Sequence, residues 1–163
     1  MQDEVDDLVA AWHGVRPDLV LHPVHVWSRI HRLALHLDDA RRRCFSQLSV
    51  EVWEFDVLAA LRKSGPPYQL APGQLIRETH VTSGTMTNRI DRLTQRGLVI
   101  RHSNPEDRRG VLVELTDAGI ELADTAFSRL LAIEAQLLAE IDSESQQQLI
   151  DALRTLLVAQ NED

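Results

Sequence analysis

Polar side chains within residues 82–95 have the types and the spacing that could read a nucleic acid. Met86, Ile90 and Leu93 stand at i, i+4 and i+7, which predicts a helix with one apolar stripe that ends near Gly97. The outer face would carry Gly84, Asn88, Asp91 and Gln95, with Thr85 and Arg92 on its flank. The candidate DNA contacts are hydroxyl, amide and guanidinium groups: Ser83, Thr85, Thr87, Asn88 and Arg92. Such groups can contact bases and phosphates when a helix lies in a DNA major groove. An ordinary amphipathic surface helix has the same pattern, and for this segment alone it is the favoured interpretation.

The residues that follow predict two short strands joined by a basic, turn-rich tip. We expect strands at 98–101 and 111–115, and Thr116 has the side chain to cap another helix. Arg108 and Arg109 lie near the tip, where guanidinium groups can contact DNA phosphates together with Arg92. Helix, turn, helix and a basic hairpin form a winged helix-turn-helix, and this context favours DNA binding over an ordinary surface helix.

Charge is distributed unevenly along the chain. The net charge of −8 is unfavourable for binding phosphates. Between Arg77 and Arg109, however, seven arginines and four acids give +3, so the rest of the chain carries −11. A basic face on an acidic body is compatible with local docking to DNA.

The length of 163 residues predicts a single domain that is mainly α-helical with a small β-hairpin wing. Further helices are expected at about 3–13, 23–45, 50–64 with Ser49 as its cap, 72–80, 117–141, and from Ser143 onward. Residues 1–163 would therefore comprise N-terminal helices (1–48), a winged helix-turn-helix (49–116) and C-terminal helices (117–163). The flanking helices carry more apolar surface than the winged unit can cover, which predicts a homodimer.

Asp56 interrupts an otherwise apolar helix. A carboxylate there should be paired, protonated or placed at a cavity. Arg89 lies about 60° from the centre of the apolar stripe on its own helix, so it could meet Asp56, and Arg101 could reach the same region. A structural salt bridge is the more frequent arrangement, whereas an acid and arginines around one space also suit a planar anion.

The hairpin carries a motif of a known family. Its pattern Asp-x-Arg-x-x-x-Val-x-Leu-Thr is met by Asp107, Arg109, Val113, Leu115 and Thr116. With the preceding helix, this resembles the MarR family of bacterial transcription regulators. The resemblance implies a twofold dimer, formed through the terminal helices, that represses by binding a palindromic operator in double-stranded DNA. In this family the pair Asp107 and Arg109 also shapes the wing.

A narrower resemblance concerns the effector. Residues 53–58 (Trp-Glu-Phe-Asp-Val-Leu), with Gly-Pro-Pro at 65–67 and Thr-Ser-Gly at 82–84, resemble the urate-responsive branch of the family, the PecS and HucR type. That branch has an extra N-terminal helix bearing a tryptophan, which corresponds to residues 3–13. Its urate-binding set matches Trp12, Asp56, Arg89 and Arg101. The resemblance implies that urate or a related purine releases the protein from DNA.

Several classes of protein are disfavoured. There is no glycine-rich phosphate loop or nucleophile elbow, so an enzyme is not expected, and neither is a cofactor. The second helix carries four histidines: His22, His25, His31 and His36. Metal binding by these residues is not favoured, because no cysteine or aspartate completes a set of ligands. The acidic start and the absence of a membrane-length apolar run predict a cytoplasmic protein.

Three alternatives stay open. The effector could instead be a phenolic acid. An oxidant could be sensed through Cys44, which follows three arginines and is otherwise a small buried hydrophobe. The winged helix could also serve as a protein-interaction module without DNA binding, which salt-dependent binding to a duplex would exclude.

Overall fold

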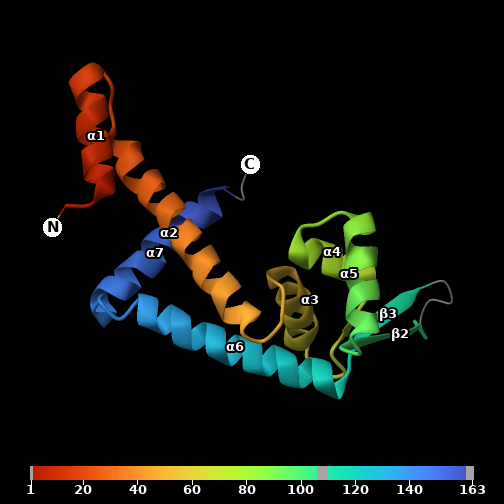
Figure 1. Cartoon of the computed structure of the whole chain (residues 1–163). Helices are drawn as coiled ribbons and strands as arrows, with labels where there is room; N and C mark the ends of the chain where they lie inside the picture. The colour runs from red at the N-terminus through yellow and green to blue at the C-terminus, as the bar shows by residue number, and fades with distance from the viewer. Residues whose placement is uncertain (1, 106–109, 161–163) are drawn as a thin grey trace.

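Helices dominate the computed structural model, which describes residues 2–105 and 110–160 (Figure 1). In chain order its elements are α1 (Glu4–Val15), α2 (His22–Ser46), α3 (Val52–Lys63), β1 (Gln69–Leu70), α4 (Pro72–Thr79), α5 (Ser83–Gln95), β2 (Val99–Ser103), β3 (Val111–Leu115), α6 (Asp117–Leu137) and α7 (Ser143–Gln160). The mainly α-helical fold with a hairpin wing agrees with the prediction from the sequence.

The helices near the two ends of the chain, α1, α2, α6 and α7, lie beside the winged unit (Figure 1). α1 packs against α2 and buries Val5, and both α2 and α3 contact α6, the long helix that runs along one side of the molecule (Figure 1). α7 turns back from the end of α6 and buries none of its residues. Its apolar stripe is exposed and comprises Leu149, Ile150, Leu153, Leu157 and Val158.

The winged unit has a core of its own. α3, α4 and α5 pack with the sheet around a buried apolar cluster that includes Leu58, Leu75, Met86 and Val113. The sheet is antiparallel in the order β1-β3-β2, and the register of the hairpin pairs Arg101 with Val113. The hairpin strands agree with the predicted ones, whereas β1 was not predicted. A strand of two residues is too short to produce an alternating pattern.

One predicted helix start is wrong. Ser49 does not cap α3, because its backbone is left-handed (φ 53°) and the helix begins three residues later. There the carboxylate of Glu54 accepts the N–H of Glu51 at 2.9 Å. The predicted start of the last helix at Ser143 is correct, and there the carboxylate of Asp142 accepts the N–H of Ser145 at 2.9 Å. At both helix starts a carboxylate accepts a backbone amide hydrogen.

Two further features of the structure concern the length of apolar helices and the burial of Cys44. Within 2–105 and 110–160, no helix is both long and apolar enough to cross a bilayer. Cys44 is 2% exposed and packs with Phe45, Val50 and Phe55 in a second apolar cluster between α2, α3 and α6. Its interpretation as a small buried hydrophobe is therefore confirmed.

Candidate nucleic-acid interface

α5 is built as the sequence predicts for a recognition helix. The hydroxyl of Thr82 accepts the N–H of Thr85 at 3.3 Å and caps the helix. Met86, Ile90 and Leu93 are at most 1% exposed and fix the helix on the core of the winged unit. Gly97 then takes a φ of 70°, so the chain can leave α5 and enter the wing at once.

The face of α5 opposite the core is polar and exposed. All five side chains predicted to contact DNA from this helix are exposed: Ser83, Thr85, Thr87, Asn88 and Arg92. Gly84 adds a bare stretch of backbone, because a Cβ there would have no atom within 4 Å. A shallow hollow of about 460 Å³ opens along this face, lined by Trp53, Gly84, Thr85, Asn88, Arg89 and Arg92. The face therefore offers donors and acceptors with little steric obstruction.

Two consecutive residues of α3 hold arginines of α5. The indole of Trp53 lies 4.7 Å from the guanidinium carbon of Arg92 and 5.4 Å from that of Arg89. The carboxylate of Glu54, which is 2% exposed, lies 2.5 Å from Nη1 of Arg96. Neither residue was expected to take part in the site. Glu54 stands three residues after Glu51, the N-cap of α3, and this spacing could have indicated a helix start. Nothing in the neighbouring sequence, however, predicts that Glu54 pairs with Arg96.

The base of the wing is tied to α5 by another arginine. Arg101 on β2 lies 2.6 Å from the carboxylate of Asp91, and its Nη2 donates to the carbonyl of Thr87 at 3.4 Å. Across the hairpin, Nε2 of His102 lies 2.8 Å from the carboxylate of Glu114. Asp107, Arg108 and Arg109, the predicted contacts at the tip of the wing, lie outside the described residues.

The four residues expected to bind urate lie on four different elements. Trp12 is on α1 and 48% exposed, Asp56 is on α3, Arg89 is on α5 and Arg101 is on β2. The expected contact of Asp56 with Arg89 is wrong for this chain. Asp56 is half-buried and lies 3.0 Å from Nη2 of Arg41, on α2, while Arg89 lies over Trp53. The buried acid of α3 is Glu54, because the third position of the helix points toward the α2–α3 loop and α5.

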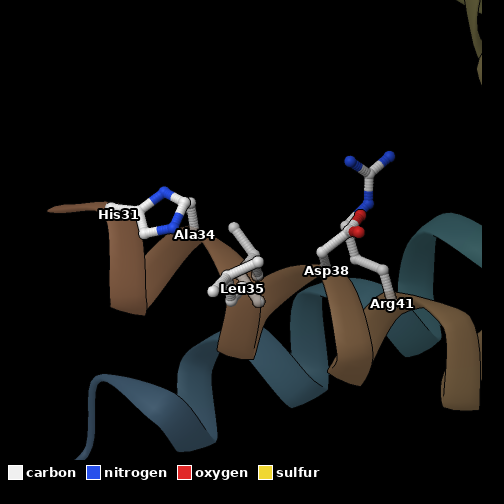
Figure 2. Close-up of a pocket in the computed structure, with 6 residues that line it drawn as sticks. His31, Ala34, Leu35, Asp38 and Arg41 are labelled. Carbon is white, nitrogen blue, oxygen red and sulfur yellow. The ribbon is translucent and has the colours of Figure 1, made fainter.

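Two hollows lie near these charged groups. One, of about 350 Å³, is lined by residues of α3 and α4 that include Asp56 and His80. The other, of about 370 Å³, follows α2, and Figure 2 shows His31 and Arg41 projecting to the same side of that helix. Among the described residues, no group of three or more His, Cys, Asp or Glu side chains is arranged to hold a metal ion.

Comparison with known proteins identifies the family. A family model described as "MarR family" matches residues 48–110. The chain is 35% identical over 146 residues to the HTH-type transcriptional regulator PecS of Dickeya dadantii, covering 90% of this chain and 88% of that protein. It is 33% identical over 107 residues to the multiple antibiotic resistance protein MarR of Escherichia coli, covering 66% and 72%.

A solved structure supports the same assignment. A mutant MarR from E. coli in complex with operator DNA superposes with a TM-score of 0.72 at 26% identity, covering 85% of this chain and 98% of that one. The fold, the polar face of α5 and these similarities agree. The chain belongs to the MarR family and is a DNA-binding transcription regulator, not an enzyme.

Proposed function

We propose that this chain forms a homodimer that represses transcription by binding a palindromic operator, and that urate or a related purine anion releases it. The observation that carries the DNA part is the exposed polar face of α5, where hydroxyl, amide and guanidinium groups surround a bare glycine. A helix of this kind can approach base edges closely, while arginines contact the backbone. The similarity to PecS and to the operator-bound MarR supports this proposal.

The dimer follows from the apolar surface that one chain leaves uncovered. α7 exposes the stripe described above, and α2 exposes large apolar side chains along its length: Val26, Trp27, Leu33, Leu35 and Leu37. Two helices with exposed stripes of this size favour association with a second copy. A twofold dimer would present two copies of α5, and half-sites about 10 bp apart, or one turn of DNA, would fit them.

The proposed response to urate uses charged groups that already hold the winged unit together. Arg101 links β2 to α5 through Asp91 at 2.6 Å. A purine anion that took this guanidinium would free Asp91 and loosen the hold of the wing on α5. In this chain Arg89 lies over Trp53 and Trp12 stands on α1, which packs against α2, so a rearrangement or the second copy of the chain would have to bring a second cation and an aromatic face to the same anion. Asp56, which pairs with Arg41, would be repelled by the anion. Coupling of about 1–3 kcal/mol between effector and DNA is typical of such regulators.

The experiment is a titration of the purified protein against its own upstream intergenic DNA, at fixed salt, with increasing urate. Release by urate is the expected result. Trp12→Phe and Asp56→Asn should weaken the response to urate while DNA binding without urate is retained. Asp39→Asn is the matched control, because that carboxylate is exposed and pairs with Arg43 on the same helix. A full urate response in both site variants would overturn the assignment of the pocket.

Two other results would redirect the proposal. Tight DNA binding that urate leaves unchanged would retain the regulator and overturn the effector, and other purines, phenolic acids and oxidation of Cys44 would then be tested. The absence of specific, salt-dependent binding to any duplex would overturn operator binding and favour the protein-interaction module.

A further inference from the structure

Three arginines of α5 form a row that faces the start of α3. Arg89, Arg92 and Arg96 stand at i, i+3 and i+7, so they share one side of the helix. Arg96, at the C-terminal end, is held by the buried Glu54 at 2.5 Å and by the carbonyl of Ser49 at 3.0 Å. The row thus begins beside the exposed polar face and ends at an ion pair with a buried carboxylate.

The first two arginines of this row are held differently. Both guanidinium groups lie over the indole of Trp53, at 5.4 Å for Arg89 and 4.7 Å for Arg92. Within the described part of the chain, neither forms an ion pair with a carboxylate, whereas Arg41, Arg96 and Arg101 each do. Their positive charge is therefore restrained in position without being neutralised.

An aromatic ring can hold a guanidinium group in position without neutralising its charge. A guanidinium that lies on the face of an indole is attracted by the ring, and its N–H donors, which lie in its own plane, stay free to bond outward. A carboxylate in the same place would consume those donors. Trp53 is itself half-buried against the apolar core of the winged unit, so its ring has a fixed position. Holding long side chains in place before binding lowers the entropy lost on binding.

We infer that Trp53 is a positioning residue for DNA binding, which presents Arg89 and Arg92 to backbone phosphates beside the base-reading side chains of α5. Thr85 and Asn88 line the same hollow as Trp53 and the two arginines, so phosphate and base contacts would form next to each other. This inference rests on the proposed operator binding. It predicts that Trp53 acts through the arginines and not by direct contact with DNA.

A double-mutant cycle tests this mechanism. Binding to the upstream duplex is measured by fluorescence anisotropy over a series of salt concentrations for the wild type, Trp53→Leu, Arg92→Gln and the double variant. Trp53→Phe tests rescue by another aromatic ring, and thermal melting establishes that each variant is folded. Arg43→Gln is the matched control for loss of a positive charge, because that side chain is exposed on α2 and pairs with Asp39.

Trp53→Leu should weaken binding about threefold to tenfold, as expected for loss of a cation–π contact. It should also lower the slope of log affinity against log salt by up to about one, the value for one phosphate contact. In the Arg92→Gln background the same substitution should cost much less, and Trp53→Phe should restore most of the affinity and the slope.

Two results would overturn the inference. Additive costs with an unchanged salt slope would mean that Trp53 only stabilises the fold. Equal losses in Trp53→Phe and Trp53→Leu would mean that the aromatic face is not what matters. If the wild type itself shows no salt-dependent binding to any duplex, the proposed function fails, and this inference fails with it.

Discussion

The buried carboxylate of Glu54 on α3 forms an ion pair with Arg96 at the end of α5, an exposed residue, with 2.5 Å between a carboxylate oxygen and Nη1. The same carboxylate accepts the backbone N–H of Glu51 at 2.9 Å, and Arg96 also donates to the carbonyl of Ser49 at 3.0 Å. One acid therefore fixes the start of α3, the end of α5 and the loop that follows α2. This link joins the end of the recognition helix to α3, in addition to the apolar contacts of Met86, Ile90 and Leu93.

Replacing Glu54 by glutamine should destabilise the fold. The amide keeps the shape but leaves Arg96 without its charged acceptor, and the loss of a hydrogen bond between charged groups costs about 1–3 kcal/mol. Urea denaturation should show a lower midpoint with an unchanged slope. Glu121→Gln, an exposed acid on α6, is the matched control and should leave the midpoint unchanged. Equal midpoints for the two variants would contradict the importance of this pair.

Gly119 allows α6 to approach the start of the wing. A Cβ at this position would lie 2.1 Å from the carbonyl oxygen of Leu98, a distance that no backbone contact tolerates. Gly119→Ala should therefore shift backbone and cost about 1–3 kcal/mol, as overpacking of an interior does. Gly73→Ala on α4, where the nearest atom would be 4.0 Å away, is the control. A melting temperature for Gly119→Ala at or above that of Gly73→Ala would show that the contact relaxes freely.

Replacing Gly84 by alanine should change the stability of the fold and the affinity for DNA in opposite directions. Because a Cβ at this position would meet no atom within 4 Å, alanine should raise the stability of α5 by up to about 1 kcal/mol through helix propensity. The same methyl group would stand on the face that approaches the bases and should weaken operator binding. Gly14→Ala on α1, also in open space, should change stability similarly without affecting DNA binding. Unchanged affinity in Gly84→Ala would mean that DNA does not approach this face closely.

The predicted and observed features of α3 and α5 show which parts of the fold and of the candidate site could be predicted from the sequence. The apolar stripe of α5 was predicted because its period is local, and the wing followed from turn residues and a family motif. Asp56 was expected to be the buried acid of α3, but Glu54 is. The apolar neighbours of Asp56 indicated a buried carboxylate there, whereas Glu54 is held by the N–H of Glu51 and by Arg96, which is 42 residues away in the sequence. Contacts between distant residues leave no periodic pattern, and Trp53 was missed for the same reason.

The docking of α1 on α2 should depend on pH through Arg29. Its guanidinium donates to Asp3 at 2.8 and 2.9 Å and to Asp6 at 2.8 Å. The hydrogen bond from Arg29 is the main cause that lowers the pKa of Asp3, whereas for Asp6 the backbone N–H of Asp3 comes first and Arg29 second. Lowered carboxyl pKa values stabilise docking above the ordinary carboxyl range, and this contribution is lost as the pH falls through them.

Substitution of Arg29 tests this assignment directly. In Arg29→Gln the pKa of Asp3 should rise toward its ordinary value, and that of Asp6 should rise less, because a backbone hydrogen bond that remains is the main cause of its lowering. Carboxyl carbon shifts followed by NMR from neutral pH down through the acidic range measure both midpoints. Arg43→Gln on the same helix, whose partner is Asp39, should alter neither. Since both aspartates are exposed at the surface, high salt should reduce the difference between wild type and Arg29→Gln. Identical midpoints at low salt would show that Arg29 does not hold α1 in place.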